Sequence, residues 1–459
     1  MPEALFTFTH LWRVAAPPDR VFAVLADPDR YDQWWPQIRS VTRLGPDDGL
    51  ARVRSLLPLT LTLHLRRIET DAAAGRLAVA RTLGYRPIAA WLKAVAPALY
   101  PLIRLPVYAV VAYASAVVDM ALILGPANPP PLSVAVLRWA SDPNLSARFL
   151  ASAGAVLQLL VTLAALALWW LGERALARLT RGWLVSGSRE LAETPLRAVA
   201  GAAMGMVAAL SVLGLLCLAL WSLAAAWRYP AALPTAWTLQ HWMQHLPQLW
   251  SPMLSSLALG LASTGFSFLV ALGALEHELA TGRRPGWGAL LVLYLPLLVP
   301  PVAFLFGLAI AAEAVGLTPG FASVILAHVV LVLPYVYLSL SEPYRRLDPR
   351  WSQQAATLGI SPLRTFLTVR LPLLLAPCLT AIAVGFAVSV AQYLPTQLVG
   401  AGRIATVTTE TVALASGGER SAIGVSGLVQ ALLPAVGFAL AMGLPRLLWH
   451  NRKAMRGMA

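Results

Sequence analysis

The chain has 459 residues, of which 58% are hydrophobic and only 12% are charged. Soluble domains carry about twice that share of charged residues, so this composition excludes an ordinary soluble protein. Lys and Arg outnumber Asp and Glu by 35 to 21. Because basic residues of membrane proteins gather in cytoplasmic loops, this excess does not predict a nucleic-acid partner. The two cysteines lie in apolar stretches and predict no disulfide framework.

The N-terminal segment, residues 1–80, is polar and differs from the rest. A strand-like run at 5–14 and a short helix pattern at 17–31 precede three strand-like runs, at 40–44, 51–57 and 61–70. This β-α-β-β-β order, with the sequence DPDRYDQWWPQI, resembles the START-like helix-grip fold of the polyketide cyclase type. The resemblance stops near Val79, so we expect residues 1–80 to be a truncated, incomplete α+β segment in the cytoplasm. No cleavable signal is expected at the start of the chain.

Most of the remaining chain consists of apolar stretches that are long enough to cross a bilayer. About eight such spans are predicted, at 105–125, 149–171, 198–227, 253–275, 289–313, 321–340, 372–394 and 425–449. Pro300 and Pro301 are expected to break or kink the fifth span. The sequence therefore predicts an all-α polytopic membrane protein.

The basic residues predict how the spans are oriented. The connecting segments at 81–104, 172–197, 276–288, 341–371 and 450–459 contain 19 Lys and Arg residues together. The segments at 126–148, 228–252, 314–320 and 395–424 contain 5. Since the basic segments remain inside, we expect the first set and both termini to be cytoplasmic.

Two of the basic segments are similar at one constant offset in residue number. The sequence TLGYRPIAAWLKAVAP begins at Thr82, and TLGISPLRTFLTVRLP begins at Thr357. Repeats in transporters indicate two pseudo-symmetric halves around one pathway. We therefore expect a shortened first half at 81–171 with one loop and two spans. A cytoplasmic linker at 172–197 and a complete second half of six spans at 198–459 follow.

The second copy of the repeat has the pattern of two short helices joined at a glycine. Helix starts are predicted at 348–349 and 361–362, where an N-cap residue precedes a proline. Gly359 can adopt the left-handed conformation that ends the first helix. We expect one apolar stripe of the first helix to pack on the membrane part, formed by Trp351, Ala355 and Leu358. Such a preordered projection suits docking to a second protein.

This segment resembles the EAA motif of ABC-importer permeases. Gln353-Gln354-Ala355 occupies the Glu-Ala-Ala position, and 369–372 occupies the final Ile-x-Leu-Pro. The resemblance implies that the loop enters a cleft of a separate ATP-hydrolysing subunit; the motif's Glu is Gln here, so its ion pair with the ATPase is not carried over. By this resemblance, the coupling role is expected at Gln353, Gln354, Ala355, Leu358, Gly359, Ser361, Pro362, Val369, Leu371 and Pro372. A degenerate second copy has Leu83, Gly84, Pro87 and Pro97.

Further stretches are similar to fused two-domain permeases of the ferric-iron, polyamine and thiamine importer group, at 118–126, 295–307, 328–340, 385–396 and 400–418. This resemblance implies an inner-membrane permease subunit that moves a small solute, with thiamine as the first candidate. The partners that it implies are an ATP-binding subunit, a periplasmic solute-binding protein, a second permease chain and membrane lipid.

Polar residues inside the spans are the candidates for the pathway, namely Asp119, Gln392 and Tyr393. The alternative for Asp119 is an interfacial carboxylate that meets water, and the alternative for Gln392 and Tyr393 is a hydrogen bond between helices. His328 is expected to be a packing residue with satisfied hydrogen bonds. The sequence has no phosphate-binding G-x-x-x-x-G-K-[ST] loop, no clustered metal ligands and no catalytic triad, so it predicts no enzyme, no metal and no cofactor.

Two other interpretations stay open from the sequence. The chain could be a membrane-tethered START-like protein that binds a ligand or lipid. It could also be a fusion product with impaired transport, because both modules break at 79–81. The transporter interpretation has the support of the longer resemblance, which covers roughly residues 82–450.

Overall fold

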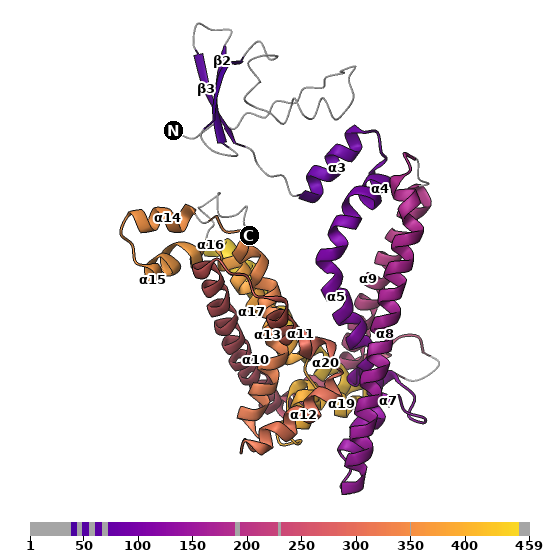
Figure 1. Ribbon diagram of the computed structural model, residues 1–459. Helices are drawn as coiled ribbons and strands as arrows, with labels where there is room; N and C mark the ends of the chain where they lie inside the picture. The colour runs from indigo at the N-terminus through magenta and orange to yellow at the C-terminus, as the bar shows by residue number, and fades with distance from the viewer. Residues whose placement is uncertain are drawn as a thin grey trace. The chain divides into compact units, whose positions relative to one another are not determined.

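The computed structural model describes residues 38–43, 48–54, 60–66, 72–188, 193–227, 231–348 and 350–448. Figure 1 labels the elements of the chain, which divides into two compact units. The first unit comprises residues 1–104 and 179–199, and the second comprises 105–178 and 200–459. The strand predicted at 5–14 and the helix predicted at 17–31 lie outside the described residues.

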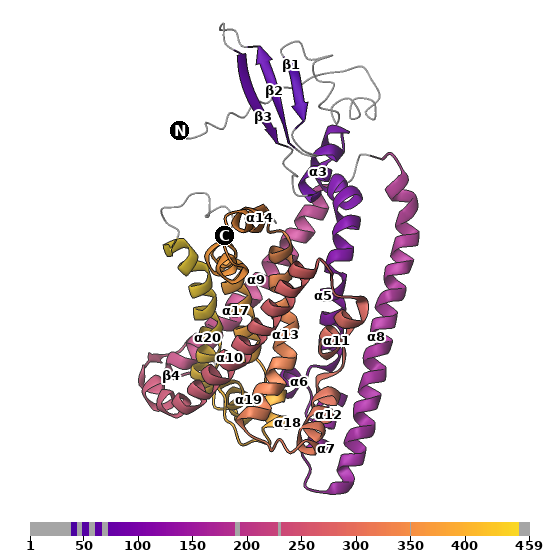
Figure 2. The same cartoon turned by 60° about the vertical axis from the view of Figure 1, so that its left-hand side comes forward.

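The first unit contains a three-stranded antiparallel sheet, with strands β1 (Ile38–Arg43), β2 (Asp48–Arg54) and β3 (Thr60–Arg66) in that order (Figure 2). The β2–β3 register runs from Asp48 opposite Arg66 to Arg54 opposite Thr60. These strands overlap the three strand-like runs predicted from the sequence. Helical elements follow them, namely α3 (Ala72–Thr82), α4 (Pro87–Ala90), the π-helix η2 (Trp91–Val95) and the start of α5 (Ala96–Ala116).

The second unit is helical. Its elements before the second repeat copy are the rest of α5, α6 (Asp119–Leu124), α7 (Leu132–Ala140), α8 (Leu145–Val185), α9 (Glu193–Leu223), α10 (Gln240–Thr281), α11 (Trp287–Leu298), α12 (Pro301–Ala314) and α13 (Phe321–Arg345). The later elements are α14 (Arg350–Thr357), α15 (Pro362–Thr365), the π-helix η3 (Phe366–Arg370), α16 (Leu371–Leu373), α17 (Leu375–Val390), α18 (Leu394–Val399), α19 (Val407–Gly417) and α20 (Arg420–Leu448). Helices α10, α13, α17 and α20 pack on one another and form the centre of this unit.

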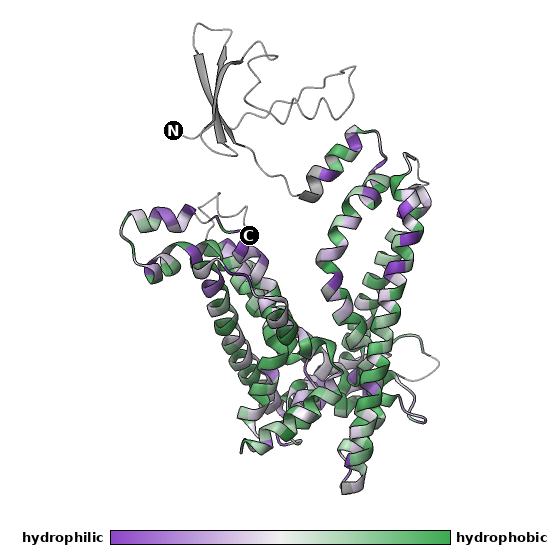
Figure 3. Cartoon of the chain, viewed as in Figure 1, coloured by the Kyte–Doolittle hydropathy of each residue, from purple (hydrophilic) through white to green (hydrophobic). Residues whose placement is uncertain are grey.

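Within the described residues, six helices are long and apolar enough to cross a membrane, and the number rises to eight if each of two bent helix pairs is one span (Figure 3). This confirms the predicted fold class. One pair is α11 and α12, which are bent by 108°, and the other joins residues 362–373 to α17 with a bend of 77°. The first break falls at Val299 and Pro300. The prolines therefore break the fifth span and do not merely kink it, because proline cannot continue the helical hydrogen bonding.

The helices differ from the predicted spans at their ends. Helix α8 continues to Val185, well into the segment predicted as a linker from residue 172. Charged residues such as Arg174 disfavour lipid but not the helical conformation, so hydropathy locates the lipid-facing part and not the helix end. The predicted third span ends at residue 227, but its helix ends at Leu223. The next residues, Ala224–Ala226 (β4), pair instead with Ala236–Trp237 (β5).

The helices of the two repeat copies begin and end at equivalent positions. The offset that pairs Thr82 with Thr357 also aligns both ends of α4, η2 and α6 with those of α15, η3 and α18. The same offset aligns the starts of α7 and α8 with the starts of α19 and α20. The first half therefore contains counterparts of α18 and α19 in addition to the loop and two spans that the sequence predicts.

Close packing in the second unit depends on a glycine of α17. A Cβ atom added to Gly385 would lie 2.7 Å from Val336 Cγ2, 2.9 Å from Thr264 Cγ2 and 3.2 Å from Val332 Cγ1. These atoms belong to α10 and α13, so Gly385 lets three span helices approach closely. Small residues commonly have this role at helix contacts in membranes.

We expect Gly385→Ala to destabilise the second unit by about 1–3 kcal/mol, because the added methyl group overpacks the contact. Gly443→Ala is the matched control, since nothing lies within 4 Å of the corresponding Cβ on α20. That change should be neutral or stabilise the helix by ~0.5–1 kcal/mol. Unfolding of the purified protein in mixed micelles measures both variants. Equal stability of the two would contradict the packing role of Gly385.

Candidate functional sites: a helical elbow and a membrane cavity

The second repeat copy forms a sharp helical elbow, which we define as residues 350–373. Gly359 has a φ angle of +72°, in the left-handed region where a residue with a Cβ is strained. The Ile360 amide donates to the Ala355 carbonyl at 3.0 Å, and the Gly359 amide donates to the Ala356 carbonyl at 3.0 Å. These two bonds define a Schellman motif. The predicted helix–glycine–helix geometry is therefore confirmed.

The start of the elbow is capped by an aspartate. Asp348 Oδ1 accepts a hydrogen bond from the Arg350 amide at 2.9 Å, as an N-cap residue does for the free amides of a helix start. Pro349 lies outside the described residues. The second helix, α15, begins with Pro362, where the missing amide costs nothing.

The predicted packing of the apolar stripe is wrong. Ala355 is buried, but Trp351 is 48% exposed and Leu358 is 77% exposed. The elbow buries Ala355 within its own bend, where α14 contacts α15 and η3, and this fold turns the larger apolar side chains outward. Leu363 and Leu367 on the second arm are also exposed. The elbow therefore presents an apolar surface that its own unit does not cover.

The other coupling positions divide between the tip and the base of the elbow. The exposed positions at the tip are Gln353, Gln354, Leu358, Gly359, Ser361 and Pro362. The partly buried positions at the base are Val369, Leu371 and Pro372. Hence the structure brings the predicted residues together on one bent segment, with the polar and apolar tip available for contact.

The first repeat copy forms the same turn. Gly84 has a φ angle of +83°. The Tyr85 amide donates to the Ala80 carbonyl at 3.2 Å, and the Gly84 amide donates to the Arg81 carbonyl at 3.0 Å. Ala80 is buried like its counterpart Ala355. The predicted second copy, with Leu83, Gly84, Pro87 and Pro97, thus has the same backbone geometry although its sequence is degenerate.

A charged cluster joins the elbow to the span helices of the same unit. Arg370 in η3 forms an ion pair with Glu276 at the end of α10, with 2.6 Å between Nη1 and Oε2. Arg370 Nε also donates to Ser352 Oγ in α14 at 2.9 Å. The Tyr344 hydroxyl at the end of α13 donates to the other oxygen of Glu276. One carboxylate therefore connects α10, α13 and both arms of the elbow.

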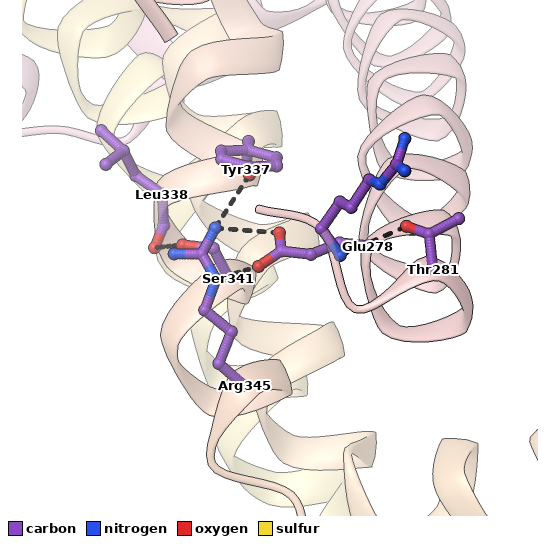
Figure 4. Close-up of polar contacts among 7 residues, drawn as sticks. Glu278, Thr281, Tyr337, Leu338, Ser341 and Arg345 are labelled. Atoms are coloured by element: carbon purple, nitrogen blue, oxygen red, sulfur yellow. Dashed lines mark hydrogen bonds and ion pairs between the residues drawn. The ribbon is translucent and has the colours of Figure 1, made fainter. Parts of the chain in front are cut away.

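A second ion pair lies next to this cluster (Figure 4). Arg345 Nε and Nη2 donate to the two oxygens of Glu278 at 2.8 and 3.0 Å. Arg345 Nη2 also donates to the Tyr337 hydroxyl at 3.1 Å. Two parallel bonds between a guanidinium and a carboxylate fix geometry as well as energy. Neither Glu276 nor Glu278 is predicted from the sequence, where the available signal was two acidic residues after an apolar span.

The three candidate pathway residues line one cavity of the second unit, with a volume of about 240 Å³. Asp119 reaches it from the start of α6, and Gln392 and Tyr393 reach it from the turn between α17 and α18. Residues 113–119 and 388–394 correspond by the offset of the repeat, and both segments contribute to the lining. The cavity therefore lies where the two repeat copies meet.

His328 forms hydrogen bonds to residues that lie next to the lining residues in the sequence. It is buried, and its two ring nitrogens lie 2.8 Å from Ser389 Oγ and 3.0 Å from Thr396 Oγ1. Thr396 Oγ1 in turn donates to the Gln392 carbonyl at 3.2 Å. Both nitrogens have partners, so the prediction of a satisfied packing histidine is confirmed.

Comparison with known protein families assigns the part of the chain that contains the elbow to one family. Residues 263–448 match the family described as binding-protein-dependent transport system inner membrane component. This segment is a permease domain of that family. Residues 6–90 match a second family, described as polyketide cyclase / dehydrase and lipid transport. That match confirms the START-like resemblance and carries it beyond the expected end near Val79.

The permease domain lies within a longer region of the chain that is similar to ABC transporter permeases. The chain is 32% identical over 364 residues to the inner membrane ABC transporter permease protein YnjC of Escherichia coli (strain K12), which covers 78% of this chain and 64% of YnjC. It therefore spans slightly less than two thirds of that relative. It is 26% identical over 225 residues to the putative 2-aminoethylphosphonate transport system permease protein PhnV of Salmonella choleraesuis (strain SC-B67), with 48% of this chain and 84% of PhnV covered. The molybdenum transport system permease protein ModB of Haemophilus influenzae is 31% identical over 115 residues, with 22% of this chain and 50% of ModB covered.

We expect Arg370→Ala to loosen the elbow of the permease domain. The change removes a charge-assisted hydrogen bond and leaves Glu276 without its cation, which should cost about 1–3 kcal/mol. Hydrogen exchange of the α14 amides should speed up accordingly. Arg364→Ala is the matched control, because Arg364 is exposed on the same elbow. If both variants exchange at the wild-type rate, the charged cluster does not hold the elbow.

Proposed function

We propose that the chain is the membrane-spanning permease subunit of an ATP-binding-cassette importer. It moves a small solute across the bacterial inner membrane, and a separate ATP-binding subunit supplies the energy. The family match of residues 263–448 supports the class. The observation that carries the mechanism is the elbow, which bends at Gly359, is exposed at its tip and is bonded at its base to α10 and α13.

The elbow has the properties that a docking element needs. Its two helices are ordered before any partner binds, so docking loses little conformational entropy. Its exposed apolar side chains would lose contact with water in a partner's cleft, which favours association. The coupling residues at the tip are Gln353, Gln354, Leu358, Gly359, Ser361 and Pro362.

The base of the elbow has the properties that force transmission needs. Arg370 and Ser352 connect its two arms, and Glu276 connects Arg370 to α10 and to Tyr344 of α13. A displacement of the tip would therefore reach two span helices through directional bonds. Helix α13 also supplies Leu331 and Tyr335 to the cavity lining, so the same helix contacts both sites.

The partners and orientation follow from this function. We propose that the elbow and both termini face the cytoplasm, where ATP is available, and that a periplasmic binding protein delivers the solute from the other side. A second permease chain completes the shortened first half, and membrane lipid covers the spans. Thiamine is the solute that the family resemblance supplies, whereas PhnV and ModB are named for a phosphonate and for molybdenum.

A second candidate function belongs to the first unit. The match of residues 6–90 to a family that includes lipid transport proteins favours binding of an apolar ligand there. A cavity of about 520 Å³ in this unit is lined mainly by apolar residues between Val79 and Ala94, with Arg76 and Lys93 beside them. This unit would then add a ligand-binding role to the permease rather than replace it.

The coupling role predicts that Gly359→Pro abolishes function while the protein still inserts. Proline cannot adopt the φ angle of +72° and cannot donate the amide bond to Ala356. We expect the affinity-tagged chain to lose its copurifying ATP-binding subunit and the complex to lose ATP hydrolysis.

Gly316→Pro provides a matched control for this variant. Gly316 has a φ angle of +79° and the same pair of hydrogen bonds, but it lies between α12 and α13. Equal loss of ATP-binding subunit in both variants would attribute the effect to general strain and contradict the coupling role of the elbow.

The proposed orientation can be measured by labelling single cysteines. With Cys217 and Cys378 replaced, Ser361→Cys at the elbow tip should react with a membrane-impermeant maleimide only in inverted vesicles. Thr318→Cys, in the exposed loop between α12 and α13, should react only in right-side-out spheroplasts. The reverse pattern would place the elbow outside the cell, where no ATPase could reach it.

A further inference from the structure

Helix α10 is longer than one membrane crossing. It has 42 residues and a length of about 63 Å, whereas the hydrocarbon core of a bilayer is ~30 Å thick. Glu276, with its ion pair to Arg370, marks the end of α10 that joins the elbow. About 20 residues cross the core, so a crossing that starts at Glu276 ends near Ser256. The segment that precedes it, residues 239–251, is named the α10 extension below, and its surroundings are the question.

One side of the α10 extension is fixed to its own unit. Leu249 is buried in a cluster with three valines of α19 and α20. His241 Nε2 lies 3.1 Å from the carbonyl oxygen of Ala224 in β4. His245 Nε2 lies 3.5 Å from Oε1 of Glu419, at the start of α20. These contacts determine which way the other sides of the segment face.

The exposed surface of the α10 extension divides into an apolar and a polar sector. The apolar side chains follow one another at spacings of four, three and four residues and are 37–75% exposed, namely Leu239, Met243, Leu246 and Trp250. Residues at this spacing lie on one face of a helix. The exposed polar side chains recur every four residues on a neighbouring face, namely Gln240, Gln244 and Gln248. Such a division is typical of a helix that lies between an apolar medium and water.

Two observations identify lipid as the partner of the apolar sector. Leu254 and Leu261 continue the same stripe into the crossing, where they are exposed, so the sector is continuous with the lipid-facing surface of α10. Trp237 and Trp250 are both exposed, and indole rings are enriched where a membrane meets water. No Lys, Arg, Asp or Glu occurs at residues 231–251, so contact with the bilayer desolvates no charge of this segment.

We propose that the α10 extension is an interfacial anchor in the leaflet opposite to the elbow. Its apolar sector contacts the acyl chains and its three glutamines face water. A helix longer than the hydrocarbon core reaches this position by tilting, and Pro247 and Pro252 inside α10 allow a bend toward the bilayer. The inference goes beyond the proposed function and rests on it only for which leaflet is the outer one.

The anchor gives α10 a fixed point far from the elbow. The elbow holds one end of this helix through Arg370 and Glu276, and the bilayer interface holds the other end. A displacement of the elbow would then turn α10 about its anchored end and would not move the whole helix along its axis.

Spin labels on the full chain in lipid nanodiscs test the anchor without any partner protein. Oxygen concentrates among acyl chains and a nickel chelate remains in water, so the ratio of oxygen to nickel collisions reports the surroundings of each label. With both native cysteines replaced, we expect the ratio at Met243→Cys to approach that at Leu261→Cys in the crossing. At Gln244→Cys the ratio should be several-fold lower and close to that at Thr318→Cys, in an exposed loop.

A change of the indole tests what holds the segment in place. Trp250→Gln should lower the oxygen-to-nickel ratio of a label at Met243→Cys several-fold, and Trp250→Phe should retain most of it, because a phenyl ring still favours the bilayer. Trp287→Gln is the matched control, since Trp287 is an exposed tryptophan of α11 outside the extension. It should leave the ratio unchanged, and equal effects of Trp250→Gln and Trp287→Gln would contradict the anchoring role.

Each other result of the labelling decides against the anchor. A ratio at Met243→Cys equal to that at Thr318→Cys places the extension in water and overturns the proposal. Few collisions with either reagent place a second copy of the chain over the apolar sector and overturn it as well. A chain with lipid contact at Met243→Cys that recruits no ATP-binding subunit through the elbow refutes the importer function alone and leaves the anchor in place.

Discussion

The contact between Glu276 and Arg370 is the interaction on which the arrangement of the second unit depends. The elbow exposes most of its tip, so few apolar contacts hold it against the span helices. One carboxylate at the end of α10 accepts bonds from Arg370 and Tyr344, and Arg370 also binds Ser352. Directional bonds fix the base of the elbow where packing is sparse, and the tip is left for a partner. Apolar contacts alone are non-directional and would not fix the base of the elbow at one position on the span helices, whereas these bonds do.

The repeat explains why a cavity forms where it does. Helix α6 and helix α18 are short helices that follow a span and end at equivalent glycines of the two copies, Gly125 and Gly400. The break before each of them leaves backbone groups without helical partners, and such groups are tolerated inside a membrane protein where they face protein or a cavity. Where the two broken segments meet, they leave a cavity that is lined mainly by apolar residues and includes Asp119 and Gln392. The pseudo-symmetry of the fold thus places Asp119 and Gln392 in one site although they belong to different halves of the sequence.

The sequence predicted the features that depend on local chemistry. Eight spans, the break at Pro300, the turn at Gly359 and the packing of His328 follow from hydropathy, proline and glycine conformations and hydrogen-bond needs. The outward direction of Trp351 and Leu358 was not predictable, because an apolar stripe at helical spacing does not say which surface it faces. The pairing of Glu276 with Arg370 joins residues 94 positions apart, which no periodicity encodes. The domain boundaries, the orientation and the coupling role of the site residues stay predictions.

The first repeat copy has the backbone geometry of the elbow but is held by different contacts. The position of Arg370 is Val95 in the first copy, which is buried. There Lys93 Nζ donates to the carbonyls of Ser186 and Ser188 at 2.7 and 2.9 Å and lies 4.8 Å from the centre of the Trp183 ring. Carbonyl dipoles and a ring bind a cation less tightly than a carboxylate does. The first repeat copy therefore lacks the ion pair through which the elbow reaches α10 and α13.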